Sequence, residues 1–243
     1  MASGEVIAFV DRDLRGARFS NSTLTGAVMR GVDVVGLDID TPWLTDGPLL
    51  VNGVDVAPLV EAELNRRFAG RELRQAPDPA GLRSAWAALE RAWAAAIDQA
   101  TAMHPEAVDV SVDGEWSFAQ TLRHLACATD VWLGKAILRR PQPFHPLGLP
   151  YAEYETDGFD MSIFATRQPS LTEVLDLRAD RQAMVRDFLA SVTPEQLAEP
   201  RVHPWSPEQE VSVVRCLHVV LHEEWEHLRF ALRDLNAQGS APT

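Results

Sequence analysis

The strongest hydrophobic pattern lies near the end of the chain, where residues 207–236 are expected to form one amphipathic helix. At about 100° of rotation per residue, Cys216, Val219, Val220 and Phe230 fall on a single face. The ionisable side chains that we expect to face solvent fall on another arc: Arg215, His222, Glu226, Arg229 and Arg233. The helix is therefore expected to pack its apolar face against the rest of the chain.

A second apolar arc lies opposite the first and consists of Leu221, Trp225, Leu228 and Leu232. A helix that is apolar on two sides is normally buried on both. The partner on this side is either the N-terminal part of the chain or a second copy, so the pattern allows a homodimer.

Three more segments have the apolar spacing of a helix: residues 82–103, 117–138 and 170–192. The last of them begins with Ser170 and Glu173 at the spacing of a capping box. Together with residues 207–236, these segments predict a mainly α fold built as a four-helix bundle. A long connection rich in proline and acidic residues, from 141 to 169, separates the second helix from the third.

Residues 12–39 carry a different period, with an apolar side chain at every fifth position. The row consists of Leu14, Phe19, Leu24, Met29, Val34 and Ile39. A period of five fits neither a helix nor a simple strand, but it fits a β-solenoid whose coil sides are five-residue units. The stretch resembles pentapeptide repeats and would dock as a short cap, because so few coils cannot bury a core. The alternative is an irregular glycine-rich leader.

Between this cap and the helices, Asn52-Gly53 lies between apolar residues and predicts a β-hairpin. Residues 57–68 then predict a short amphipathic helix, and residues 69–80 a linker. We therefore divide the chain into three parts: the repeat-like cap (1–45), the hairpin, short helix and linker (46–80), and the four-helix bundle (81–238).

The chain has 243 residues and a formal net charge of −13. Such an acidic balance argues against nucleic acid and anionic membrane surfaces as partners. No apolar run approaches the roughly 20 residues of a membrane span, and the first residues lack the pattern of a secretion signal. We therefore expect a cytoplasmic protein.

Two cysteines, Cys127 and Cys216, both fall in predicted helices. They are too few for a disulfide framework and fit a reduced cytosol. Cys216 shares the apolar face of residues 207–236. It is either a soft metal ligand, a reactive thiol or, as is more common for such a residue, a small buried hydrophobe.

Two polar residues stand in the middle of that apolar face: Glu223 and His227, one helical turn apart. His124 takes a similar inward position in the segment 117–138. Buried carboxylates and imidazoles are costly unless they are paired or bound to a cation. Three inward ligands from two helices, completed by water, form the open arrangement of a catalytic metal site. The alternative is a buried Glu–His hydrogen bond beside a core histidine.

The spacing excludes one well-known metal motif. A zincin requires His-Glu-x-x-His, whereas this chain has His222-Glu223-x-x-x-His227. His222 falls on the solvated arc, so we expect it to play no part in the site.

Three short motifs resemble the DinB-like superfamily of four-helix bundles: Gly114-Glu115-Trp116-Ser117, Leu122-Arg123-His124-Leu125 and Glu223-Glu224-Trp225-Glu226-His227. They are most similar to the branch that includes mycothiol-dependent maleylpyruvate isomerase, over residues 81–236. The resemblance implies an up-down-down-up bundle and a divalent metal, zinc being the one we expect, held by His124, Glu223 and His227. Many relatives carry His where this chain has Glu223, which is a departure from the commoner pattern.

The resemblance also implies chemistry with a low-molecular-weight thiol such as mycothiol. We expect a metal-dependent enzyme that carries out S-transfer or isomerisation on a small electrophilic substrate. A metal-dependent hydrolase and a non-catalytic stress-response or interaction module are the alternatives. Arg178 and Arg181, near the apolar stripe of residues 170–192, either anchor a carboxylate of the thiol cofactor or form salt bridges within the chain.

Overall fold

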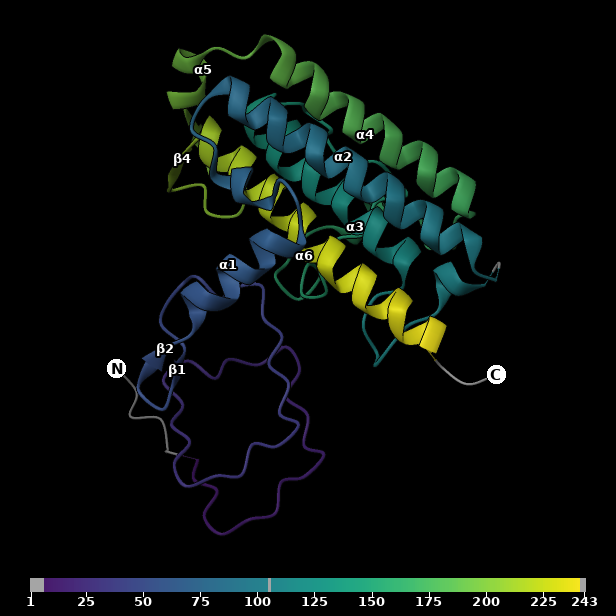
Figure 1. Ribbon diagram of the computed structural model, residues 1–243. Helices are drawn as coiled ribbons and strands as arrows, with labels where there is room; N and C mark the ends of the chain where they lie inside the picture. The colour runs from purple at the N-terminus through teal and green to yellow at the C-terminus, as the bar shows by residue number, and fades with distance from the viewer. Residues whose placement is uncertain (1–6, 105, 241–243) are drawn as a thin grey trace. The chain divides into compact units, whose positions relative to one another are not determined.

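The computed structural model describes residues 7–104 and 106–240 and is mainly helical (Figure 1). Its internal contacts divide the chain into two compact units, Met1–Thr41 and Pro42–Thr243. All described helices and strands belong to the second unit. None of these helices is both long enough and apolar enough to cross a lipid bilayer.

Four long helices of the second unit pack around a common core: α2 (Pro79–Ala102), α3 (Phe118–Thr129), α4 (Leu171–Ser191) and α6 (Val213–Ser240). α2 contacts α4 and α6, and α3 contacts the same two helices, so the four form a closed ring. Figure 1 shows α4 running alongside α2. Trp93, Leu122 and Leu228 are completely buried in the core.

The helix starts follow the sequence signals. The Ser170 side chain accepts a hydrogen bond from the backbone N–H of Glu173, and the Glu173 carboxylate accepts one from the backbone N–H of Ser170. This reciprocal pair is the capping box expected from the sequence. Ser117 and Gln120 begin α3 in the same way.

The second predicted helix changes its hydrogen-bond pattern halfway along. α3 ends at Thr129, and η3 (Asp130–Ile137) continues it as a π-helix. Asp130 is completely buried there, where its carboxylate accepts hydrogen bonds from Arg181 of α4 and from the backbone N–H of His145. Apolar spacing does not predict this change, because a π-helical stretch of eight residues is too short to establish a period of its own.

The segment before the bundle is more structured than a linker. β1 (Leu50–Val51) and β2 (Val54–Asp55) form the expected hairpin, and α1 (Ala57–Arg67) follows. The prediction of a linker over 69–80 is wrong in part, because the short 3-10 helix η1 (Arg71–Gln75) packs against α2 and α6.

This packing corrects the assignment of Glu226 to the solvated arc. Glu226 is buried, and its carboxylate accepts a hydrogen bond of 3.0 Å from Arg71 of η1. Arg71 also donates to Glu61 of α1 at 2.9 Å. A helical-wheel projection of α6 alone does not predict the Arg71–Glu226 ion pair, because Arg71 lies in a distant segment of the sequence.

The same segment covers the second apolar arc of α6. Trp225 is 1% exposed, and its ring centroid lies 6.4 Å from that of Phe68. Gly70 allows this close approach, because a Cβ atom there would lie 2.4 Å from the Cβ of Ala88 in α2. The chain itself therefore buries the arc, and no second copy is needed for that purpose.

The long connection is folded rather than extended. We call residues 141–169 the loop lobe; it contains the short 3-10 helix η4 (Met161–Ile163). Tyr154 and Phe164 are buried in the loop lobe and pack with Cys127 of α3 as a small second core. Four partly buried aromatic residues surround this core: Phe144, Tyr151, Phe159 and Trp205.

The proline-rich link before α6 also folds, into α5 (Pro194–Ala198) and a hairpin. β3 (Pro200–Val202) pairs with β4 (Glu210–Ser212) in antiparallel register. Because residues 210–212 form a strand, α6 begins at Val213 and not at the predicted residue 207.

Residues 7–41 contain no helix or strand. Their backbone nevertheless repeats at intervals of five, with positive φ at Asp11, Gly16, Asn21, Gly26, Gly31 and Gly36. The apolar row of this segment is about half exposed, from 46% at Leu14 to 62% at Met29. The five-residue period is therefore present in the backbone geometry, while the row itself is not buried.

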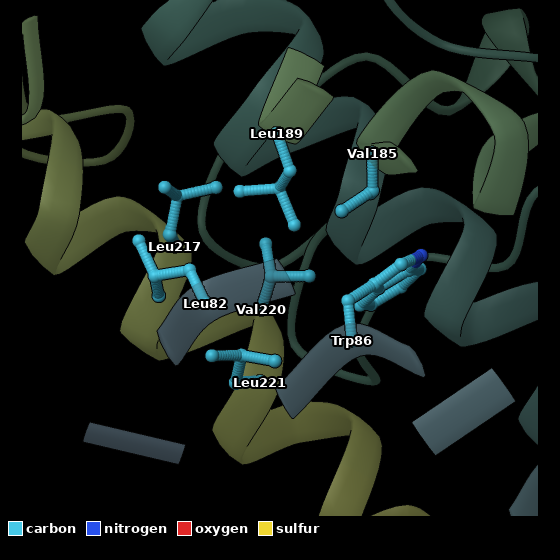
Figure 2. A pocket seen from close by; sticks show the side chains of 7 residues that line it. All are labelled: Leu82, Trp86, Val185, Leu189, Leu217, Val220 and Leu221. Atoms are coloured by element: carbon cyan, nitrogen blue, oxygen red, sulfur yellow. The ribbon is translucent and has the colours of Figure 1, made fainter. Parts of the chain in front are cut away.

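A small apolar void of about 10 Å³ lies between α2, α4 and α6 (Figure 2). Its lining consists of Leu82, Trp86, Val185, Leu189, Leu217, Val220 and Leu221. A volume of this size holds about one water molecule, and an apolar lining offers water no partners. It is a packing defect of the core and too small for a substrate.

The buried Arg71–Glu226 pair generates a prediction about stability. Arg71→Ala removes a buried cation from Glu226 and Glu61, which keep only their second partners, Arg229 and Arg74. We therefore expect the free energy of unfolding to fall by about 3 kcal/mol, the lower end of the range for breaking a buried ion pair. Urea denaturation measures this loss. The matched control is Arg66→Ala, which removes an ion pair to Glu63 whose arginine is 72% exposed. We expect less than about 1 kcal/mol there, and equal losses in the two variants would contradict the analysis.

Candidate metal centre

Three side chains from two helices converge at one point of the bundle. His124 comes from α3, and Glu223 and His227 come from successive turns of α6. The Nε2 atoms of His124 and His227 lie 3.4 Å and 3.3 Å from Oε2 of Glu223. Among the described residues these three form the one group of histidine, cysteine or acidic side chains that could hold a metal ion, with ligand atoms all within 4.8 Å of one another.

The two separations from Oε2 of Glu223 fit a shared cation better than direct hydrogen bonds. Zinc binds nitrogen and oxygen ligands at about 2.0–2.2 Å, so neighbouring ligand atoms of a tetrahedral site lie about 3.3–3.5 Å apart. A hydrogen bond between ionised groups is shorter, at about 2.7–2.9 Å. The separations of 3.4 Å and 3.3 Å fall in the first range. Two imidazoles and one carboxylate are also ligands that zinc prefers.

The charge states of the two α6 residues suit metal binding. Burial would raise the pKa of Glu223, but the neighbouring imidazoles of His124 and His227 reverse this and hold the pKa well below its usual value. Burial lowers the pKa of His227, although Glu223 opposes the shift. At neutral pH the site therefore presents a carboxylate and a neutral imidazole, the forms that coordinate a cation.

One side of the site is open. The Glu223 side chain is 32% exposed, whereas those of His124 and His227 are 11% and 16% exposed. A metal held by these three ligands would keep a coordination position for water or a substrate, as catalytic sites do.

Aromatic side chains flank the two histidines. The ring of Trp116 lies 4.4 Å from that of His124 and 5.9 Å from that of His227. Phe230, one turn along α6, packs edge-on against His227 at 5.8 Å. Trp116 was not among the site residues expected from the sequence. Its position two residues before the start of α3, the helix that carries His124, could have suggested that assignment.

A backbone contact completes the surroundings of His124. The Nδ1 atom of His124 lies 3.2 Å from the carbonyl oxygen of Leu149 in the loop lobe. When Nδ1 donates its proton to this carbonyl, Nε2 keeps a free lone pair toward Glu223. No sequence signal predicts this partner, because any residue has a carbonyl group.

Arg178 and Arg181 form ion pairs within the chain, the second of the two roles considered for them. Arg178 is 1% exposed and pairs with Glu224 of α6. Arg181 is buried and pairs with Asp130 of η3. Both guanidinium groups are therefore engaged by carboxylates of the helical core.

Neither cysteine reaches the site as a ligand. Both thiols are free and buried. Burial raises the pKa of Cys127 to about 12 and that of Cys216 to about 11, so both stay protonated at neutral pH. His218 of α6 also lies outside the group, and its Nε2 atom is 2.9 Å from the carbonyl oxygen of Ala76.

The geometry predicts that His124→Ala weakens zinc binding by more than about 100-fold, because a metal ligand contributes at least as much as the residues that orient it. Protein purified without added metal or tag-derived nickel should carry about one ion per chain, and the variant should carry none. Elemental analysis and chelator competition measure both. His222→Ala, on the same helix but outside the group, should keep the ion. No metal in any of the three proteins, even after zinc is offered, would leave the three residues as hydrogen-bonded core groups.

Comparison with protein-family models places most of the chain in a known family. A family model described as the DinB superfamily matches residues 56–231, a range that includes His124, Glu223 and His227. No curated protein and no solved structure matches the chain. Since the matched range covers most of the 243 residues, the chain belongs to the DinB superfamily.

Proposed function

We propose that this protein is a metal-dependent enzyme that uses a low-molecular-weight thiol, such as mycothiol, for S-transfer to or isomerisation of a small electrophile. The observation that carries the proposal is the separation of 3.3–3.4 Å between the imidazole nitrogens and Oε2 of Glu223, on a site with one open side. Zinc is the metal we expect, because the donor set suits it. Membership of the DinB superfamily supports the assignment.

His124, Glu223 and His227 would hold the ion. When bound, a divalent metal lowers the pKa of a coordinated thiol or water, which gives a nucleophile at neutral pH. Imidazole ligands carry no charge when they coordinate a metal, so this donor set would leave a zinc ion with a net positive charge, which favours an anionic thiolate. Trp116 and Phe230 would exclude water from the flanks of the two histidines.

The nucleophile in this proposal comes from outside the chain. Both cysteines of the sequence, Cys127 and Cys216, are buried and have raised pKa values. A buried thiol that stays protonated is a poor nucleophile. This supports a free thiol, or alternatively water, as the attacking group.

We also infer the finer points of the architecture. The ring of α2, α3, α4 and α6, with the long loop lobe between the second and third helices, supports an up-down-down-up four-helix bundle. The positive φ at every fifth residue from Asp11 to Gly36 supports a pentapeptide-repeat-like coil at the N-terminus. A cytoplasmic location and a homodimer remain predictions.

Two other functions share parts of this evidence. A metal-dependent hydrolase would use the same three ligands with water at the open side, which the 32% exposure of Glu223 favours. A non-catalytic interaction module is favoured by the exposed apolar row of the N-terminal unit, because contiguous exposed apolar surface commonly binds partners.

The proposal predicts thiol-dependent turnover. The zinc-loaded protein should consume a small electrophile, such as an epoxide or an unsaturated acid, at least about tenfold faster when mycothiol is supplied, because coordination generates the thiolate. Chelation of the metal and the Glu223→Ala substitution should each abolish the increase. Product formation is followed by chromatography, with His222→Ala as the active control.

The outcomes separate the three functions. Rates that respond to metal but not to thiol across a broad electrophile panel would favour the hydrolase. Stoichiometric metal with no turnover of any substrate would favour the interaction module.

A further inference from the structure

The loop lobe touches the candidate metal centre at one place, beside His124. The backbone N–H of Leu149 donates to the carbonyl of Arg123, and Nε of Arg123 donates to the carbonyl of Leu147, at 3.2 Å and 2.8 Å. The third contact is that between His124 Nδ1 and the carbonyl of Leu149, at 3.2 Å. Two neighbouring residues of α3 are therefore joined to a short stretch of the loop lobe by three polar contacts.

That stretch is held at its other end as well. The backbone N–H of His145 donates to the buried carboxylate of Asp130 at 2.9 Å, which is itself paired with Arg181 of α4. The backbone N–H of Leu147 reaches Nδ1 of His145 at 3.1 Å. Residues 145–149 are thus fixed between η3 and the ligand-bearing part of α3.

The rest of the loop lobe supports this stretch through its own core. The backbone N–H of Ala165 donates to the carbonyl of Pro146 at 2.7 Å, which ties the end of the loop lobe to its beginning. Tyr154 is 4% exposed, and its ring lies 4.9–6.4 Å from those of Phe159, Phe164 and Phe144. Removing this ring would loosen the support of residues 145–149 without touching a ligand.

We propose that the loop lobe is the outer shell of the metal centre, in which the carbonyl of Leu149 holds the imidazole of His124 in the Nδ1–H tautomer and aims Nε2 at the metal position. Leu149 is a positioning residue, because it acts through His124. The inference rests on the proposed metal centre, but not on thiol chemistry. Metal-binding histidines are commonly oriented through their second nitrogen, and loss of the orienting partner weakens metal binding by about 10–100-fold.

The arrangement makes metal binding and the folding of the loop lobe depend on each other. If an ordered loop lobe raises the affinity of the site for zinc, then zinc must stabilise the loop lobe by the same factor. Amide hydrogens of residues 145–165 should therefore exchange more slowly with solvent in the zinc-loaded protein than in the metal-free protein. The exposed N-terminal residues 7–41 should not respond.

The test uses the full chain and changes the loop lobe at a distance from the ligands. Tyr154→Ala removes the ring at the centre of the second core. Tyr154→Phe keeps that ring and serves as the conservative control. Leu189→Ala is a second control, because Leu189 is 2% exposed but lies beside the apolar void at α4.

Zinc affinity is measured by competition with a chelator, and the ligand geometry by the visible absorption of the cobalt-substituted protein. We expect Tyr154→Ala to bind zinc about 10–100-fold more weakly and to show an altered cobalt spectrum. Tyr154→Phe and Leu189→Ala should stay within about twofold of the parent, although Leu189→Ala should lower the unfolding temperature.

A second variant tests the same inference if Tyr154→Ala does not fold. Arg123→Met keeps an unbranched stem of similar bulk near the backbone but removes the guanidinium group and its hydrogen bond to the carbonyl of Leu147. It should weaken zinc binding in the same direction, with circular dichroism showing an intact helical fold.

The outcomes distinguish this inference from the proposed function. Unchanged zinc affinity and cobalt spectra in the folded Tyr154→Ala and Arg123→Met variants would overturn the inference alone. Weaker zinc binding in these variants, together with no thiol-dependent turnover in the parent, would support the inference and reject the thiol enzyme. A parent that binds no zinc would reject both.

Discussion

Two buried ion pairs fix the position of α6 against its neighbours, and the candidate metal centre depends on that position. Arg178 of α4 pairs with Glu224, and Arg71 of η1 pairs with Glu226. Arg181 of α4 holds η3 through Asp130 in the same way. A buried charge without its partner is strongly unfavourable. Rotating or sliding α6 past its neighbours would therefore break contacts that are costly to lose.

Because Glu223 and Glu224 are neighbours in α6, the ion pair that fixes one of them also determines where the other points. Successive residues of a helix point about 100° apart, so Glu223 and Glu224 cannot face the same neighbour. Glu224 is directed into the core, where it meets Arg178, and Glu223 is directed toward His124. The pair that orients α6 thus places the neighbouring carboxylate where it can bridge two imidazoles. The Arg178–Glu224 ion pair therefore restricts the position of Glu223, although one side of the site stays open to solvent.

The groups at the site have two roles. Three side chains are candidate metal ligands, and other groups position those side chains. The candidate ligands His124 and His227 lie 3.4 Å and 3.3 Å from Glu223. The ring of Trp116 and the carbonyl of Leu149 contact His124 from outside this group. The loop lobe therefore contributes to the site in addition to connecting two helices. It brings a backbone acceptor to His124 and is stabilised by a small aromatic core of its own. The two cysteines are buried and lie outside this group.

The sequence by itself determined the helices, their capping boxes and the inward direction of His124, Glu223 and His227, because helical periodicity and local hydrogen bonds act within a few residues. It also carried the motifs that resemble the family. Tertiary structure decided the rest. It paired Glu226 with Arg71, and it paired Arg178 and Arg181 with carboxylates. It also formed a hairpin from residues 200–212 and a π-helix from residues 130–137. The ion pairs among these features depend on partners far away in the sequence, and a local pattern contains no information about which distant charge or carbonyl will lie beside a given residue.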